Sequence, residues 1–336
     1  MPEIVIIPYD GSAPIDKPGF YDMPAALYHA DPCILPSLSH SISKVLLRES
    51  AMHAKDEHPR LRDPDDDEEP DETNHAMDFG SAVHKEVLGK GDEIEIINAT
   101  SYQRKAAKKA RDEARAAGKI PILAKNMRRV KKCAAAVERQ MRAHPDWRHF
   151  LTAPSVSEVV LIWYEEEHGV WCRSMVDRML LETLRPYDLK STNLSASPWG
   201  WEKRMQEEYA TQDAFYRRGI TKLAGRTPDT MLFGPFEQKR PYGFSSVDAD
   251  LVLSQWADDE VEAAIIAWGV HMKSGKWPGF PNVTTHIGAR SWQADALETG
   301  LTGPGRAPRV MPQDGLAAEY RVAMAGPAVE TNVEDF

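Results

Sequence analysis

The segment Tyr187–Thr192 reads Tyr-Asp-Leu-Lys-Ser-Thr and constrains the fold of this chain more than any other stretch. Its composition predicts a short β-strand. Successive side chains of a strand point to opposite faces, so Asp188 and Lys190 share one face, roughly 7 Å apart, and Leu189 points into the core. An acid able to bind a divalent cation therefore lies beside a fixed positive charge. Alone the pattern is weak, because a solvated ion pair has the same spacing.

Two further acids lie on segments upstream of this strand. Val156–Tyr164 and Val170–Glu182 are rich in apolar residues and are joined by a polar turn, which predicts a hairpin. The first segment carries Glu158 and the second carries Asp177. The order of these strands predicts a sheet that brings the acids near Asp188. A surface acid at the strand edge is the alternative interpretation of Glu158.

Two helices are predicted around the same strands. Trp199–Arg218 has helical periodicity and places Gln212 and Tyr216 one turn apart. Another helix begins after Gly80, which lies one turn before His84. A small residue at that position allows another backbone to approach closely. Packing alone would also explain Tyr216, and a core histidine is the alternative for His84.

The composition excludes several classes of protein. A chain of 336 residues can bury a sizeable core, and no apolar run approaches the roughly 20 residues that a spanning helix needs. The first ten residues lack a basic region, so no signal peptide is expected. Three widely spaced cysteines exclude an iron–sulfur cluster, and no P-loop pattern is present. We expect a cytoplasmic protein without a membrane segment or nucleotide cofactor.

The net charge of −10 argues mildly against nucleic acid as a partner, but the charges are unevenly distributed. Asp63–Glu72 is almost wholly acidic and predicts a solvated loop, whereas residues 104–132 hold twelve Lys and Arg against two acids. The basic segment would suit a phosphate backbone. A solvated helix face explains it equally well. The candidate DNA contacts in it are Arg104, Lys105, Lys108 and Lys109.

The remaining segments give coarser predictions. Ser39 or Ser41 is expected to cap a helix, and residues 101–145 are expected to be helical with a break near Gly118–Pro121. Leu232–Phe236 and Gly243–Leu253 read as strands, and residues 259–272 as a helix.

The acids, the histidine and the lysine suit phosphodiester hydrolysis. This reaction needs an activated water and neutralisation of the developing charge, which divalent metals held by carboxylates provide. Asp177 and Asp188 can converge on one Mg²⁺, with the main-chain carbonyl of Leu189 as a third ligand. A neutral His84 could bind the same ion or a second one, and Mn²⁺ would also be accepted. Lys190 is then the electrostatic group.

The ordered set Gly80/His84, Glu158, Asp177, Asp188-Leu189-Lys190 and Gln212/Tyr216 resembles the RecB-like branch of the PD-(D/E)XK nucleases. Within that branch the chain is most similar to the phage and prophage exonuclease VIII (RecE) nuclease domains, over roughly residues 18–285. The resemblance implies an α/β restriction-endonuclease-like fold, with a mixed central sheet flanked by helices and helical N-terminal additions. It implies a nuclease domain over residues 36–290 after an N-terminal extension over 1–35. The acidic composition predicts a mobile loop near 60–75, and the content of Gly, Pro and Ala predicts a poorly ordered tail over 291–336.

Roles follow from the resemblance for individual residues. His84, Asp177 and Asp188 would be metal ligands, Lys190 the catalytic lysine and Glu158 a supporting acid. The residues implied in positioning DNA are Gln212, Tyr216, Ser191 and Thr192. Relatives often have Thr where this chain has Ser191, and the hydroxyl is retained.

The implied activity is Mg²⁺-dependent degradation of linear double-stranded DNA from its ends, in the 5′-to-3′ direction. Its product is a 3′ single-stranded tail for a separately encoded, RecT-like annealing protein, and relatives assemble as rings. Two alternatives stay open. One is a RecB-like endonuclease or other repair nuclease, and the other is a non-catalytic module that binds DNA ends through a nuclease fold.

Overall fold

The structure is a computed structural model in which residues 4–63, 75–290 and 293 are described. The chain divides into two compact units, Met1–Gly279 and Phe280–Phe336. In the second unit the described residues 280–290 form no helix or strand. Most of the predicted acidic loop and nearly all of the predicted tail lie outside the described residues, so both stay predictions.

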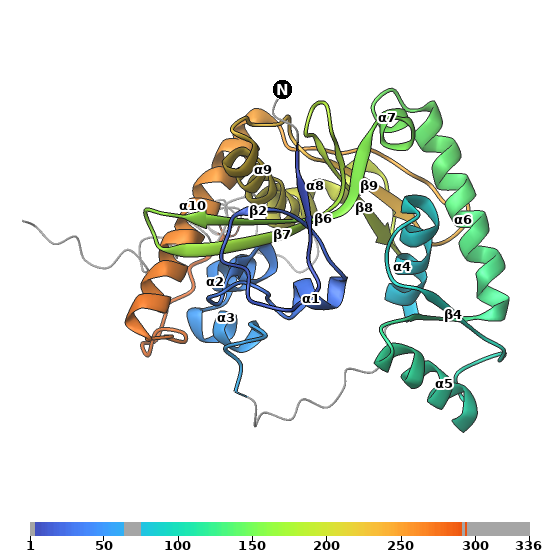
Figure 1. Cartoon of the computed structure of the whole chain (residues 1–336), viewed down its shortest axis with the longest axis horizontal. Helices are drawn as coiled ribbons and strands as arrows, with labels where there is room; N and C mark the ends of the chain where they lie inside the picture. Colours follow the sequence, from blue (N-terminus) through green and yellow to red (C-terminus); the bar gives the residue numbers. More distant parts are fainter. Residues whose placement is uncertain (1–3, 64–74, 291–292, 294–336) are drawn as a thin grey trace, which may run out of the picture. The chain divides into compact units, whose positions relative to one another are not determined.

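A seven-stranded mixed sheet forms the centre of the first unit (Figure 1). Its order is β1-β2-β6-β7-β8-β9, and β3 pairs with β7. The pairs β2–β6, β6–β7 and β7–β8 are antiparallel, whereas β1–β2, β3–β7 and β8–β9 are parallel. The mixed sheet that the sequence predicted is confirmed. The strands are β1 (Ile6–Pro8), β2 (Gly19–Asp22), β3 (Leu38–Ser39), β6 (Ser155–Glu165), β7 (Val170–Leu180), β8 (Pro186–Thr192) and β9 (Leu232–Glu237).

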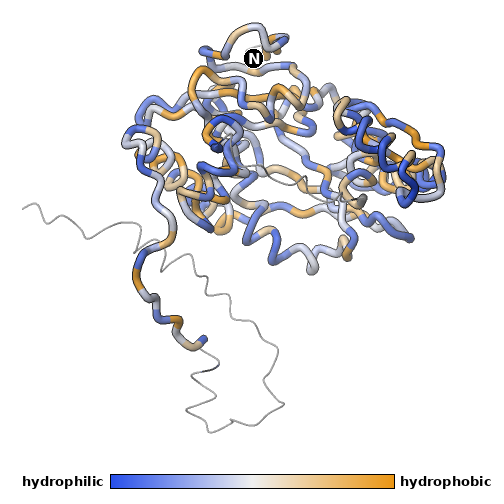
Figure 2. Tube along the Cα trace, turned by 90° about the horizontal axis from the view of Figure 1, so that it is seen from below, coloured by the Kyte–Doolittle hydropathy of each residue, from blue (hydrophilic) through white to orange (hydrophobic). Residues whose placement is uncertain are grey.

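Helices cover both faces of this sheet. One buried cluster joins the sheet to α2, α9 and α10, and a second joins it to α4, α6 and α7. Figure 2 shows apolar stretches interleaved with hydrophilic ones along the trace, as expected when each element turns one side to a core. No helix in the described part is long and apolar enough to cross a bilayer. The helices are α1 (Ala25–His29), α2 (His40–Arg48), α3 (Ala51–Glu57), α4 (His75–Leu88), α5 (Lys105–Ala116), α6 (Ala124–Ala143), α7 (Trp147–Thr152), α8 (Pro198–Arg204), α9 (Ala210–Ala224) and α10 (Leu251–Ser274).

One strand was not predicted from the sequence, and one predicted strand is absent. The break inside residues 101–145 is a strand, β5 (Ile120–Leu123), which pairs in parallel with β4 (Ile94–Ile97). Its apolar side chains are buried, and Pro121 is tolerated in such a short two-stranded sheet. Residues 243–253 form only two isolated bridges to β9, through Phe244 and Val247, and α10 already begins at Leu251.

Other predictions were confirmed in detail. Ser39 caps α2, because its hydroxyl accepts a hydrogen bond from the backbone N–H of Ile42 at 3.4 Å. The helix predicted over residues 199–218 exists but is interrupted by η1 (Met205–Tyr209), one turn of π-helix between α8 and α9. The first 35 residues supply β1 and β2 to the sheet.

Candidate active site

Strands β6 and β7 are disturbed at one position, where Glu158 lies opposite Asp177. The neighbouring residue pairs keep one register on both sides of this gap in the ladder. Glu158 has a left-handed backbone with φ of +50°, which is uncommon for a residue other than glycine. Val156 and Val159 are three residues apart yet contact the same core cluster, so the alternation of faces shifts at Glu158. Strand β7 shows the same shift at Asp177.

The Asp177 carboxylate joins three elements. Its Oδ2 lies 2.7 Å from His84 Nε2 on α4 and accepts the backbone N–H of Leu189 on β8 at 3.0 Å. Helix α4 reaches this position because Gly80 has no side chain. A Cβ at Gly80 would lie 2.9 Å from the Cβ of Ser191, closer than real side chains approach. The structure therefore shows the close approach expected at Gly80.

The carbonyl of Leu189 faces the same side as its N–H. In a strand both polar groups of one residue point to the same neighbour, and the next residue points to the other. The Thr192 carbonyl accepts from the Gln238 N–H on the β9 side, whereas the Leu189 N–H bonds Asp177 of β7. This alternation directs the Leu189 carbonyl toward β7, the strand that carries Asp177. Its role as a metal ligand stays a prediction.

Asp188 is the most enclosed acid of the site, with 4% of its surface exposed. Its Oδ2 lies 2.8 Å from Lys190 Nζ and accepts a hydrogen bond from Gln212 Nε2 at 2.6 Å. Its Oδ1 is buried and has no hydrogen-bond partner. A buried carboxylate oxygen without a partner is costly unless a ligand satisfies it.

Burial and neighbouring charge shift the titration of the acids in opposite directions. Burial, and then the charge of Asp177, raise the pKa of Asp188. Burial alone would also raise the pKa of Asp177, but the charge and hydrogen bond of His84 outweigh it and lower that pKa. Burial, the largest effect, raises the pKa of Glu158. Three acids this close need added positive charge to ionise together.

The two cationic side chains of the site, His84 and Lys190, each contact one of these acids. Burial would lower the pKa of His84, but Asp177 outweighs burial and raises it. Burial would likewise lower the pKa of Lys190, and Asp188, followed by Asp177, raises it. In each case the neighbouring carboxylate favours the charged form of the side chain.

The donor set fits a divalent metal ion. Two carboxylates, an imidazole and a carbonyl are ligands that Mg²⁺ and Mn²⁺ accept. Asp188 Oδ1 is an unsatisfied acceptor among them. Among the described residues, no three His, Cys, Asp or Glu side chains are arranged to hold a metal together. In this structure His84 is bonded to Asp177, and Asp188 is bonded to Lys190.

The remaining predicted residues lie at varied distances from this cluster. Gln212 is buried and bonds Asp188, while Tyr216 is half-buried and packs against the core. Thr192 accepts the backbone N–H of Leu194 at 3.0 Å, and Ser191 accepts Gln238 Nε2 at 3.1 Å. Both hydroxyls therefore hold nearby chain segments in place.

The four predicted basic contacts lie at α5 and are exposed. Arg104 precedes α5, which contains Lys105, Lys108 and Lys109, the last of these 3.5 Å from Glu113. No hydrogen bond or ion pair found among the described residues joins them to Asp177 or to its neighbours.

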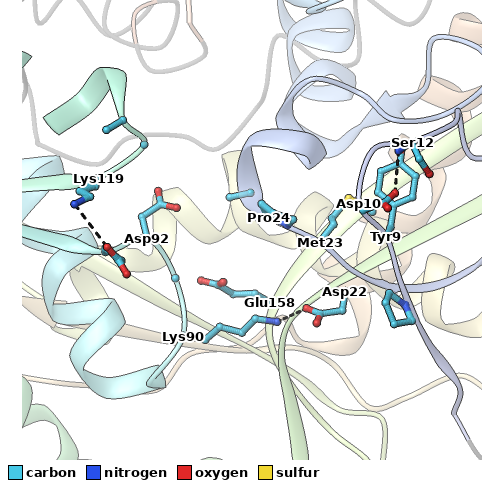
Figure 3. A pocket seen from close by; sticks show the side chains of 16 residues that line it. Tyr9, Asp10, Ser12, Asp22, Met23, Pro24, Lys90, Asp92, Lys119 and Glu158 are labelled. Carbon is cyan, nitrogen blue, oxygen red and sulfur yellow. Dashed lines mark hydrogen bonds and ion pairs between the residues drawn. The ribbon is translucent and has the colours of Figure 1, made fainter. Parts of the chain in front are cut away.

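A cleft of about 910 Å³ opens beside the site, and Glu158 lines it (Figure 3). Its walls come from β1, β2 and the loops around residues 90–93 and 117–119. Lys90 Nζ bonds Asp22 at 2.6 Å and the Ser157 carbonyl at 3.1 Å. Acids outnumber lysines on these walls, which disfavours a phosphate backbone there. No signal in the sequence pointed to this cleft.

Comparison with known proteins identifies the family of the chain. No curated protein matches the chain. The crystal structure of a "Putative exonuclease" from Eubacterium rectale matches with a TM-score of 0.48 and 13% identity, covering 78% of this chain and 93% of the other. The family described as "PDDEXK-like domain of unknown function (DUF3799)" matches residues 39–279, most of the chain and all of the site. The chain belongs to this PDDEXK-like family.

Proposed function

We propose that the chain is a metal-dependent nuclease that hydrolyses phosphodiester bonds of DNA. The observation that carries this proposal is the unpartnered, buried Oδ1 of Asp188, beside Asp177 and next to Lys190. A lone structural ion pair would leave no such acceptor. Membership of the PDDEXK-like family supports a nuclease.

Each residue of the site would have a distinct role in phosphodiester hydrolysis. Asp188 and Asp177 would hold the cation, with His84 and the Leu189 carbonyl as further donors. The bound cation supplies charge neutralisation and an acidified water. Lys190 would orient the attacking water or stabilise the developing negative charge at the phosphate. Gln212 bonds the same Asp188 oxygen as Lys190 and fixes the carboxylate orientation.

We propose further that the substrate is the end of linear double-stranded DNA, degraded 5′-to-3′ in the presence of Mg²⁺. Support comes from the resemblance to RecE nuclease domains. The 3′ single-stranded tail would pass to a RecT-like annealing protein in the cytoplasm of a bacterium or infected host. A ring of several copies would let an acidic chain enclose DNA with its basic residues turned inward. A monodisperse monomer that degrades kilobases in one encounter would exclude the ring.

The decisive experiment is digestion of linear duplex DNA labelled at the 5′ or the 3′ end, with Mg²⁺ or EDTA. Asp188→Ala and Lys190→Ala should abolish digestion, while the control Asp259→Ala, at an exposed acid of α10, should match wild type. The label that is lost first gives the polarity. Loss of label with EDTA present would contradict metal dependence.

A closed circular duplex tests the alternatives. An exonuclease leaves the circle intact, so cutting of the circle would indicate an endonuclease. If wild type and both site variants leave every substrate intact but bind DNA ends equally well, the chain is a non-catalytic binding module.

A further inference from the structure

A carboxylate and an aromatic ring both lie beside the ammonium group of Lys190. Its ammonium group lies 2.8 Å from Asp188 Oδ2 and 5.2 Å from the centre of the Tyr209 ring. An ammonium within about 6 Å of an aromatic face is attracted by the electron density of the ring, more strongly when water is excluded. Lys190 and Tyr209 are both half-buried, so this attraction is only partly screened.

The π-helical turn aligns Tyr209, the ring beside Lys190, with Trp201. In an uninterrupted α-helix, residues seven positions apart share a face. The extra residue of a π-turn lengthens this spacing to eight, which separates Trp201 from Tyr209. The two rings indeed stack, with centres 5.1 Å apart and planes inclined by 16°. A regular helix would turn one of these rings away.

Helix α2 fixes the π-turn from the side. Lys44 bonds Glu208 at 2.7 Å, and Thr211 Oγ1 donates to the Glu208 carbonyl at 3.0 Å. The single hydroxyl hydrogen of Thr211 is used in that bond, so His40 Nε2, 3.2 Å away, must donate to Thr211. Three side chains thus stabilise the backbone that presents Tyr209.

From these contacts we infer that Tyr209 is a positioning residue that holds the Lys190 ammonium in place while Asp188 binds the cation. The inference rests on the proposed nuclease function. Asp188 Oδ2 is the only charged partner within reach of Lys190 in the described contacts, and the proposed cation draws on the same carboxylate. A ring holds an ammonium without adding a metal ligand, whereas a further acid would compete for the cation.

The test is the initial rate of end-labelled duplex digestion over a range of substrate concentrations. Tyr209→Leu should lower kcat about tenfold, within the range expected for a partly buried cation–π contact, and leave KM within about twofold. Tyr209→Phe keeps the ring and should retain most of kcat. Tyr164→Leu is the matched control, because Tyr164 is half-buried and packs on Trp171 at 5.1 Å in a separate cluster. Its kcat should equal that of wild type.

Fluorinated phenylalanines at position 209 preserve the shape of the ring and weaken its negative face, so they test the inference even if Tyr209→Leu unfolds. The rate should fall stepwise as fluorines are added. A flat series, a loss of kcat in Tyr209→Phe as large as in Tyr209→Leu, or a rise in KM alone would overturn the inference. An inactive wild type would instead overturn the proposed nuclease function.

Discussion

Glu158 combines a left-handed backbone with a half-buried carboxylate in the middle of a strand. Such a conformation costs roughly 1–3 kcal/mol for an ordinary residue and persists only where the surroundings impose it. Glu158 and Asp177 keep their opposite positions in the register, but their pair is missing from the ladder and the alternation of faces shifts there. At the scale of single residues, the site is built on this local departure from strand geometry.

Two substitutions at Glu158 can separate the effect of its backbone conformation on stability from the effect of its carboxylate on activity. Asparagine adopts the left-handed conformation readily and valine does not. Glu158→Asn should leave the free energy of unfolding nearly unchanged, while Glu158→Val should lower it by roughly 1–3 kcal/mol. Urea unfolding followed by circular dichroism measures both. If Glu158→Asn keeps stability but slows digestion, the carboxylate supports the chemistry. Equal stability of the two variants would contradict the backbone argument.

The surroundings of the Asp31 carboxylate allow a prediction of how the free energy of unfolding depends on pH. This buried carboxylate accepts bonds from Ser37 N at 3.0 Å and Ser37 Oγ at 2.7 Å, and lies 3.3 Å from Arg173. Burial would raise its pKa, but the bond from His58 and the charge of Arg173 outweigh burial and lower it. A carboxyl group with a lowered pKa stabilises the fold at pH above its unfolded value of about 3.9. That stability is lost as pH falls through the folded pKa.

Urea midpoints measured between pH 2.5 and pH 7 check this expectation. Asp31→Asn suits the left-handed backbone of this position, with φ of +61°, and should cost about 3–5 kcal/mol at neutral pH because Arg173 loses its buried partner. The variant should also lose part of the acid dependence. The control Asp22→Asn removes an exposed acid and should keep the wild-type profile. An Asp31→Asn profile parallel to wild type would refute the linkage.

At the scale of elements, the contact between α4 and β8 sets the position of His84. Gly80→Ala should be destabilising by about 1–3 kcal/mol, because the added methyl group collides with Ser191. In a Ser191→Gly background the same change should cost much less, because only Gln238 Nε2, 3.2 Å from the added carbon, then has to shift. Unfolding free energies of the four chains form a double-mutant cycle. Additive effects would show that the two elements do not touch as described.

The sequence predicted the elements whose pattern is long and regular, and missed those set by distant partners. The strands around Glu158, Asp177 and Asp188 have clear apolar patterns, and all three exist. Ile120–Leu123 reads as a helix break because its pairing partner, β4, lies outside that segment. The π-turn at Met205–Tyr209 is invisible to a simple helical periodicity, since its stabilising contacts come from α2.

At the scale of the whole molecule, the residue types of the site were predictable but their pairing was not. His84 and Asp177 are 93 positions apart, and only the folded chain shows that they bond each other. The order of the motifs predicted that the acids, the histidine and the lysine lie close together. It could not predict that Oδ1 of Asp188 has no hydrogen-bond partner, because this depends on Lys190 and Gln212 both contacting Oδ2. Which oxygen of a carboxylate is contacted depends on sub-ångström geometry, and the spacing of residues in a sequence does not determine that geometry.

The uneven charge of the molecule predicts how it holds DNA. The chain has a net charge of −10, yet residues 104–132 carry twelve basic side chains against two acids, so binding should concentrate there. Arg104→Ala/Lys105→Ala/Lys108→Ala should weaken duplex binding and reduce the slope of log K against log salt by roughly 2.7, which is about 0.9 per phosphate contact. Fluorescence anisotropy on inactive Asp188→Asn protein in EDTA would measure the affinities without digestion.

The matched control changes three exposed lysines elsewhere, Lys55, Lys273 and Lys276, to alanine. It removes the same total charge, so it reports the general electrostatic attraction without the local surface. A smaller effect of the control on the salt slope supports phosphate contacts at α5, because release of condensed counterions requires close approach to the backbone. If both triple variants lower the affinity and the slope equally, only net charge matters, and α5 is a solvated helix face.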